Sequence, residues 1–298
     1  MNPLIFGFAA ILLLVPSFAV ADELKSGEYS IPQTWSQETD YARTYFVQVP
    51  EDSGEGKKLP VFIFLHGNGG NAQRAMGGFT RRYRKLANRS IMVFAQGYQR
   101  SWNIVSERSK ADDRGFIESI VLNLAKYSNV QTNNFTIMGS SNGAALCNQM
   151  AIETQLPQIR NYIFGVGQLN VFQHDGKNFK AKGDDNNYLK TSTPMSGKRL
   201  LFICGTKDLI VPYAGGPSKG IPAKGGKLAF VHAEESIFLW ARAMGYKGEK
   251  LKEPTKSEDR IDTFSYLDGD VIHLKLNGGG HGATSALTEV ALLQFLDQ

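Results

Sequence analysis

The sequence predicts an α/β fold: a mostly parallel sheet flanked by helices, with antiparallel edge strands at the N-terminal side. From about residue 60 onward, short continuous apolar runs alternate with amphipathic stretches, as expected for buried parallel strands and the helices that cover them. No internal repeat or linker divides the 298 residues, of which 42% are hydrophobic and 20% charged. We therefore expect one large domain with a sizeable core.

The first residues are typical of an export signal. The run 4–15 is nearly all apolar, and the small residues Ala19-Val20-Ala21 form a suitable cleavage site. The run is too short to span a membrane comfortably. We expect residues 1–21 to be a signal peptide and residues 22–298 to be a single domain, secreted or periplasmic. The alternatives are an uncleaved anchor and a wrongly assigned start of the sequence, because no Lys or Arg precedes the apolar run.

Strands and helices are expected along the whole of the remaining chain. Two loosely alternating strands, 28–35 and 41–49, suit an edge pair of the sheet. Further strands are expected at 59–65, 91–95, 135–138, 162–166, 199–205, 262–267 and 271–276, and helices at 72–87, 112–126, 144–150, 229–244 and near the C-terminus. The polar stretch 168–196 and the glycine-rich stretch 215–226 are expected to be loops.

The central functional motif of the chain lies in residues 135–143 and the helix expected after them. The apolar run 135–138 leads into Gly139-Ser140-Ser141-Asn142-Gly143 and then into a helical pattern. Strand, G-x-S-x-G and helix together are the context of a nucleophile elbow, in which glycines give room for a sharp turn. Ser141 would stand at its tip, near a helix N-terminus that favours a developing anion.

Three other loops at predicted strand ends supply complementary groups. Asp208 follows the strand 199–205, His281 follows the strand 271–276, and His66-Gly67-Asn68-Gly69-Gly70 follows the strand 59–65. The chain order Ser, Asp, His is the order of the α/β-hydrolase fold, whose active site lies at the carboxyl ends of the strands.

These groups suit a nucleophilic mechanism. His281 would take the proton of Ser141, and Asp208 would hold the imidazole in the required tautomer. Asp184 and Asp185 are the alternatives for the acid. The oxyanion would be held by the N–H of Asn142 and by a second N–H, from Asn68 or Gly69.

Several other residues are given structural roles. His66 is expected to orient the oxyanion turn, His174 and His232 to lie at the surface, and His273 to be structural. Cys147 and Cys204 could pair in an exported protein or remain as two buried thiols. No cluster has zinc-ligand spacing, so no metal or cofactor is expected.

The succession of motifs resembles the secreted poly(3-hydroxybutyrate) depolymerase and feruloyl esterase family of α/β-hydrolases. The similarity runs from about residue 40 to the C-terminus and rests on the motifs Leu65-His-Gly-Asn-Gly-Gly, Ser101-Trp-Asn, Asp112-Asp-Arg-Gly-Phe-Ile, Gly139-Ser-Ser-Asn-Gly, Gly205-Thr-Lys-Asp-Leu-Ile-Val-Pro-Tyr and Gly278-Gly-Gly-His. The resemblance implies a Ser141, Asp208 and His281 triad, and it places Trp102 near the substrate cleft. Ser140 and Tyr213 are counted with Trp102 as expected substrate-binding residues, although Trp102 could equally serve in packing.

The chain also departs from that family. Family members often continue the histidine loop as Gly-Gly-Gly-His-x-Trp-Pro, whereas here Gly282-Ala283-Thr284 follows His281. The sequence thus predicts a secreted serine esterase that acts on a small or oligomeric ester of the polyhydroxybutyrate, feruloyl or acetyl type. No nucleic-acid partner and no stable membrane partner is expected. The alternatives are a non-catalytic ligand-binding protein on a hydrolase scaffold and a serine peptidase.

Overall fold

The structure is a computed structural model, and it describes residues 22–298 except for 52–53, 55 and 184. The expected signal peptide, residues 1–21, lies outside the described residues. Within the described part of the chain, no helix has the length and apolar character needed to cross a membrane.

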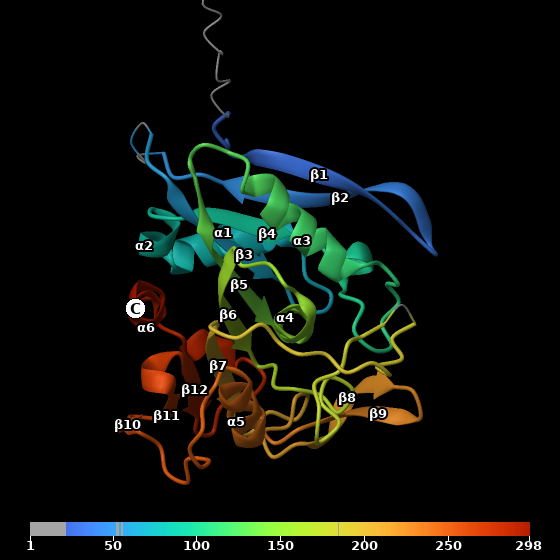
Figure 1. Cartoon of the computed structure of the whole chain (residues 1–298), viewed down its shortest axis with the longest axis vertical. Helices are drawn as coiled ribbons and strands as arrows, with labels where there is room; N and C mark the ends of the chain where they lie inside the picture. The colour runs from blue at the N-terminus through green and yellow to red at the C-terminus, as the bar shows by residue number, and fades with distance from the viewer. Residues whose placement is uncertain (1–21, 52–53, 55, 184) are drawn as a thin grey trace, which may run out of the picture.

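A ten-stranded mixed sheet forms the centre of the fold (Figure 1). Its strands lie in the order β1 (Gly27–Trp35), β2 (Glu38–Gln48), β4 (Ile91–Ala95), β3 (Leu59–Leu65), β5 (Val130–Ser140), β6 (Ile159–Gly165), β7 (Arg199–Gly205), β12 (Val271–Leu276), β11 (Ile261–Tyr266) and β10 (Lys256–Glu258). The strands from β4 to β12 in this order run parallel, while β1, β2, β11 and β10 pair antiparallel. The predicted fold class is confirmed, including the antiparallel N-terminal edge pair.

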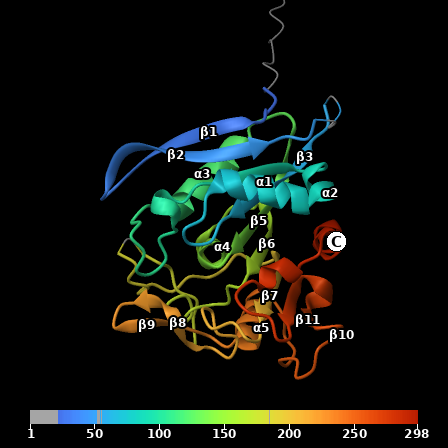
Figure 2. The same cartoon turned by 180° about the vertical axis from the view of Figure 1, so that it is seen from behind.

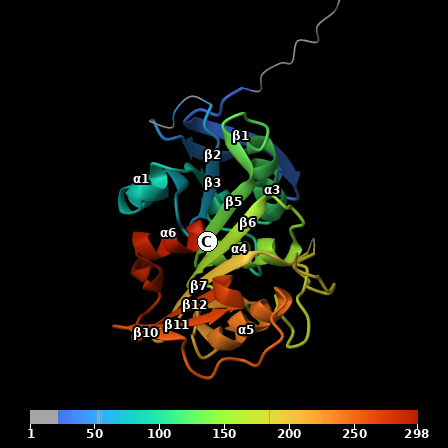
Figure 3. The same ribbon diagram turned by 60° about the vertical axis from the view of Figure 1, so that its left-hand side comes forward.

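Helices cover both faces of the sheet, as Figure 3 shows. One face carries α1 (Ala72–Arg82), α2 (Arg84–Ala87) and α6 (Glu289–Asp297), and the other carries α3 (Asp113–Leu124), α4 (Asn142–Glu153) and α5 (Ala233–Ala243). In β3, Val61, Ile63 and Leu65 face one core, whereas Phe62 faces the other. Every residue of β4 and β7 is buried, which explains the continuous apolar runs 91–95 and 200–204. Each large apolar side chain so buried contributes about 1.5–3 kcal/mol to folding.

Local sequence signals set several element boundaries. The side chain of Asp112 accepts from the N–H of Gly115 and caps α3, as expected for Asp at an N-cap. The expected helix 72–87 divides at Tyr83, whose backbone leaves the helical region. A hairpin joins β11 and β12 through a turn that contains Asp268 and Gly269, and both of these residues have positive φ.

The glycine-rich stretch 215–226 is not a loop, so this prediction is wrong. It folds into a separate hairpin of β8 (Gly216–Ala223) and β9 (Gly226–Phe230). Proline and glycine interrupt the alternation that would reveal these strands in the sequence, and the register shifts between Pro217 and Pro222. The tips of this hairpin and of the β1–β2 hairpin project beyond the same side of the main sheet (Figure 1 and Figure 2).

The described residues of the stretch 168–196 form no helix and no named strand, as expected, but the stretch is well anchored. Asn170 bridges to Phe230 of β9, and the hydroxyl of Tyr188 donates to the carbonyl oxygen of Ile104 at 2.7 Å. His174 in this stretch is buried, so the expectation of a surface position for it is wrong. The loop therefore ties the β8–β9 hairpin to the segment that precedes α3.

Candidate active site

The predicted elbow forms between β5 and α4. Ser141 has φ 54° and ψ −117°, a strained conformation for a residue with a side chain. The flanking glycines are needed for space: a Cβ on Gly139 would lie 2.1 Å from the carbonyl oxygen of Gly143, and one on Gly143 would lie 2.2 Å from that of Leu65. The strain thus falls on Ser141, while the glycines allow strand and helix to approach.

A continuous hydrogen-bonded chain joins the three residues of the predicted triad. His281 Nε2 lies 2.9 Å from Ser141 Oγ, and His281 Nδ1 lies 2.8 Å from Asp208 Oδ2. The other carboxylate oxygen of Asp208 accepts from the N–H groups of Ile210 and Val211, at 2.8 and 3.0 Å. Asp208 is therefore fixed, and its free oxygen is aimed at the imidazole. Among the alternatives for the acid, Asp185 is exposed on the 168–196 loop, and Asp184 lies outside the described residues.

Backbone contacts hold the acid loop against the histidine loop. Lys207 N–H donates to the carbonyl oxygen of Gly279 at 2.7 Å, and Gly278 N–H donates to Thr206 Oγ1 at 2.8 Å. Gly205 has no room for a side chain, because a Cβ there would lie 2.4 Å from Gly279 O. These contacts explain how His281, on a glycine-rich loop, keeps its position.

The two proposed oxyanion donors lie on facing loops. Asn142 begins α4, and first-turn N–H groups have no partner within a helix. Gly69 is excluded as a donor, because its N–H donates to Arg100 O at 2.8 Å. Among the described residues no hydrogen bond occupies the N–H of Asn68, so Asn68 remains the candidate for the second donor.

The Asn142 side chain connects the elbow to the segment that follows β4. Its Oδ1 accepts from Trp102 N–H at 2.7 Å, and its Nδ2 donates to Trp102 O at 3.1 Å and to Glu107 Oε1 at 3.3 Å. Glu107 also accepts from the N–H groups of Ile104 and Val105, at 2.9 and 2.6 Å. Burial raises the pKa of the Glu107 carboxyl. Glu107 was not predicted from the sequence, because no sequence motif identifies a carboxylate that accepts hydrogen bonds from the backbone of its own loop.

His66 has the structural role expected of it. Its Nε2 accepts from Gly97 N–H at 3.0 Å, so its Nδ1 carries the proton donated to Gly67 O at 2.8 Å. Burial lowers the pKa of His66, which favours this neutral form. The ring fixes the backbone from which the Asn68 N–H projects.

Trp102, Ser140 and Tyr213 do not contact the cleft, which corrects their expected substrate-binding role. Trp102 is fully buried and donates its indole N–H to His66 O at 2.7 Å. Tyr213 is buried, and its hydroxyl bonds Glu234 at 3.0 Å and His273 at 2.9 Å. Ser140 ends β5 and does not line the cavity.

Several histidines and cysteines lie away from the triad. His273 is fully buried, and burial lowers its pKa to about 3, in keeping with the expected structural role. Cys147 and Cys204 are both buried free thiols, so the unpaired alternative is confirmed. His232 is exposed, as expected. Across the described residues, no group of three or more His, Cys, Asp or Glu is placed to hold a metal ion.

A cavity of about 890 Å³ opens beside Ser141 and His281. An apolar wall comes from the β8–β9 hairpin and from the turn after Asp208, with Ile210, Val211, Ile221, Pro222, Leu228 and Phe230. A polar wall comes from the segment after β4, with Gln99, Arg100, Ser101, Ser106, Glu107 and Arg108. The sequence does not show which residues line these two walls, because both walls depend on how loops pack over the sheet.

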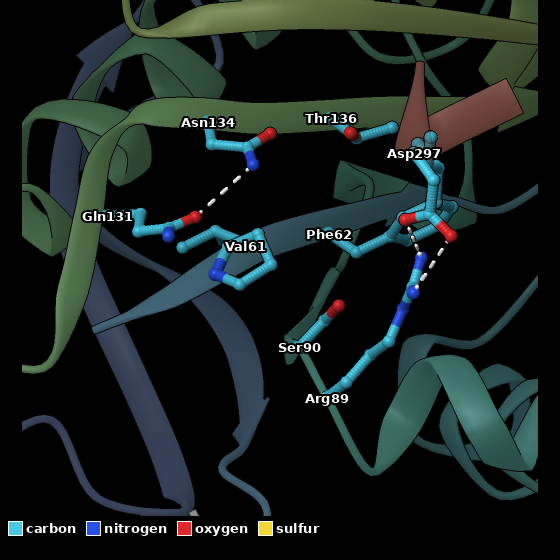
Figure 4. Close-up of a pocket in the computed structure, with 10 residues that line it drawn as sticks. Val61, Phe62, Arg89, Ser90, Gln131, Asn134, Thr136 and Asp297 are labelled. Atoms are coloured by element: carbon cyan, nitrogen blue, oxygen red, sulfur yellow. Dashed lines mark hydrogen bonds and ion pairs between the residues drawn. The ribbon is translucent and has the colours of Figure 1, made fainter. Parts of the chain in front are cut away.

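A second, smaller cavity of about 220 Å³ lies at the opposite ends of the strands (Figure 4). It is lined by residues at the start of β3, including Val61 and Phe62, and by the ion pair between Arg89 and Asp297. This cavity shares no lining residue with the cleft at Ser141.

Comparisons with known proteins bear on the fold. No protein-family model matches the chain, and no curated protein matches it in sequence. The structure is similar to an acetyl xylan esterase from Aspergillus awamori, with TM-score 0.57 and 13% identity over 91% of this chain and 99% of that one. A thermostable esterase matches with TM-score 0.55 and 14% identity, over 92% and 63% of the two chains. A propionate-bound esterase from Thermogutta terrifontis matches with TM-score 0.51 and 13% identity, over 90% and 91%. The chain therefore has the α/β-hydrolase fold.

Proposed function

We propose that this protein is a serine esterase that hydrolyses carboxylic esters through an acyl-enzyme. The observation that carries the proposal is the hydrogen-bonded chain from Ser141 through His281 to Asp208, beside the free N-terminus of α4. A serine hydroxyl needs such a base to become a nucleophile, and the base needs such an acid to hold its tautomer.

The reaction follows from this geometry. Ser141 Oγ attacks the ester carbonyl carbon while His281 Nε2 takes its proton, and the imidazolium is stabilised by Asp208. The tetrahedral oxyanion accepts hydrogen bonds from the N–H groups of Asn142 and Asn68. One such donor lowers the barrier by about 3–4 kcal/mol.

The second half of the reaction uses the same groups. His281 gives its proton to the departing alcohol, which leaves an acyl group on Ser141. A water molecule then loses a proton to His281 as it attacks the acyl carbon. Collapse of the second tetrahedral intermediate releases the acid, and the proton returns to Ser141.

The ester types that we propose are those named by the resemblance: hydroxybutyrate oligomers, feruloyl esters and acetyl esters. The similarity in fold to an acetyl xylan esterase is compatible with the last of these. After His281 the chain has Gly282-Ala283-Thr284 instead of an aromatic residue, and none of these three residues lines the cavity. We also propose that the enzyme is secreted or periplasmic after removal of residues 1–21. The mass of the mature N-terminus tests this.

Hydrolysis of p-nitrophenyl acetate and butyrate tests the esterase proposal. We expect Ser141→Ala to lose at least about 10³-fold in kcat, since the acyl-enzyme cannot form. Ser140→Ala is the matched control, because its hydroxyl is one residue away but does not line the cleft. Full activity in Ser141→Ala would overturn the proposal and favour a binding protein on a hydrolase scaffold. A panel of methyl ferulate, acetylated xylan, hydroxybutyrate oligomers and peptides then separates the ester types from a peptidase.

A further inference from the structure

The cleft beside Ser141 has two walls of different chemistry. The β8–β9 hairpin and the turn after Asp208 line one side of the cleft with apolar side chains. The 99–108 segment lines the other side with amide, hydroxyl and charged groups. Ser141 and His281 also line this cavity. A molecule that fills the cleft around the reacting ester should therefore have an apolar part and a strongly polar part.

The polar wall carries two positively charged side chains, Arg100 and Arg108. Arg100 and Arg108 are both exposed, and neither forms an ion pair with any described residue. Glu107 is the carboxylate between them in the sequence, but its oxygens are already used. They accept from the N–H groups of Ile104 and Val105 and from the side chain of Asn142. Among the described residues of this wall, the two guanidinium groups thus have no ion-pair partner, and the one carboxylate is hydrogen-bonded to the protein.

Arg100 is held in place before any ligand arrives. Its guanidinium donates to the carbonyl oxygen of Gly69, and its Nε donates to that of Gly70 at 3.3 Å. Its Nη1 has no hydrogen-bond partner among the described residues. Gln99 and Arg100 both have positive φ, 49° and 60°, which is strained for residues with side chains and is typical of functional sites. An already ordered guanidinium loses little conformational entropy on binding an anion.

We propose that the cleft accepts esters that carry a carboxylate on their acyl or alcohol part, and that Arg100 and Arg108 bind this carboxylate while the ester lies at Ser141. Guanidinium and carboxylate form strong charge-assisted hydrogen bonds in a matched planar geometry. The apolar wall contacts the hydrocarbon part of the substrate that separates the carboxylate from the ester. This inference rests on the proposed esterase function.

Matched pairs of esters test the proposal by kinetics. On the acyl side the pair is mono-4-nitrophenyl glutarate and its methyl ester. On the alcohol side it is 3-acetoxypropanoate and its methyl ester. After correction for spontaneous hydrolysis, we expect kcat/KM for the anion to exceed that for its methyl ester by at least about tenfold in one pair. The ratio should fall as salt screens the charges.

Variants of Arg108 show whether the preference comes from this wall. Arg108→Met should lower the ratio of kcat/KM for the anion to kcat/KM for its methyl ester about tenfold. Arg108→Lys should lower this ratio less, because lysine keeps the positive charge but lacks the planar guanidinium that can donate two hydrogen bonds to one carboxylate. Arg108 is exposed, so these variants should fold, which circular dichroism verifies. Ratios near one in both pairs, or ratios that Arg108→Met leaves unchanged, overturn the inference.

Equilibrium binding separates this inference from the esterase proposal. Calorimetry with the full-length Ser141→Ala protein should show the anionic ester binding at least about tenfold more tightly than its methyl ester. If neither ester is hydrolysed by the wild type but this Arg108-dependent preference remains, the carboxylate site stands and the esterase proposal fails. If Ser141-dependent hydrolysis proceeds with no preference in rate or binding, the esterase proposal stands and the carboxylate site fails.

Discussion

The N–H of Gly69 donates to the carbonyl oxygen of Arg100 at 2.8 Å, and the guanidinium of Arg100 donates back to the carbonyl oxygen of Gly69. This reciprocal contact joins the loop after β3 to the segment after β4. It removes Gly69 as an oxyanion donor and fixes the peptide next to Asn68. The position of the Asn68 N–H thus depends on a residue about 30 positions away.

Loss of the guanidinium half of this contact should slow the reaction of a neutral ester. In Arg100→Met we expect kcat for p-nitrophenyl butyrate to fall about tenfold with little change in KM, because misplacing an oxyanion donor costs transition-state rather than ground-state binding. Arg100→Lys should restore part of kcat. Arg74→Met on α1 is the matched control, since Arg74 is exposed and away from the cleft. Wild-type kcat in Arg100→Met would contradict this role.

The elbow glycines should tolerate no side chain. Gly143→Ala would place a Cβ 2.2 Å from Leu65 O, and we expect it to lower the free energy of unfolding by about 3 kcal/mol or more. Gly78→Ala is the control: Gly78 is exposed on α1, and a Cβ there meets nothing within 4 Å. It should stabilise the protein by about 0.5–1 kcal/mol. Urea denaturation measures both, and equal effects of the two substitutions would argue against the crowded elbow.

Glu107 should stabilise the wall of the cleft and thereby contribute to the free energy of unfolding. Glu107→Ala leaves the N–H groups of Ile104 and Val105 without their acceptor, at a cost of about 1–3 kcal/mol of unfolding free energy. Glu107→Gln should cost less, because an amide oxygen can still accept from both groups. Thermal denaturation compares the two variants, and a stability loss as large in Glu107→Gln as in Glu107→Ala would show that the charge itself is required.

His273 should make stability depend on pH. Burial lowers its pKa from 6.5 to about 3, so between these values the unfolded chain binds a proton that the folded protein excludes. Stability contributed by the neutral ring is therefore present above the unfolded pKa and is lost as pH falls. From about pH 7 to about pH 4 this group alone should remove on the order of 3 kcal/mol.

The variant His273→Gln isolates this effect. It should be less stable than wild type at neutral pH, because it disturbs the contact with Tyr213, but it should lose less stability on acidification. Chemical denaturation at several pH values compares the two slopes. Identical slopes would show that His273 does not titrate as its burial predicts.

The sequence was sufficient to predict the central sheet and the three residues of the hydrogen-bonded chain. Buried parallel strands have continuous apolar sequences, and Ser141 and Asp208 each follow such a strand. His281 follows β12, whose sequence alternates between apolar and polar residues. The carboxyl ends of parallel strands meet at one edge, so order along the chain was enough to bring these residues together.

The surroundings of the triad could not be predicted in the same way. The N–H of Gly69 is not free for a substrate because it donates to the carbonyl oxygen of Arg100, which lies on a different loop. Trp102 belongs to a motif of the resembled family, but its side chain is buried in the core. The strands of the β8–β9 hairpin are difficult to predict because glycines and prolines interrupt their sequences. These features arise from long-range packing, for which local sequence patterns carry little signal.

Covalent labelling of Ser141 tests the central claim most directly. A fluorophosphonate probe reacts with a serine only where a base activates the hydroxyl and an oxyanion site accepts the developing charge. We predict one adduct per chain by intact mass, mapped to Ser141 by peptide sequencing and absent in both Ser141→Ala and His281→Ala. No adduct on the folded wild-type protein, or an adduct that persists in Ser141→Ala, would contradict the account.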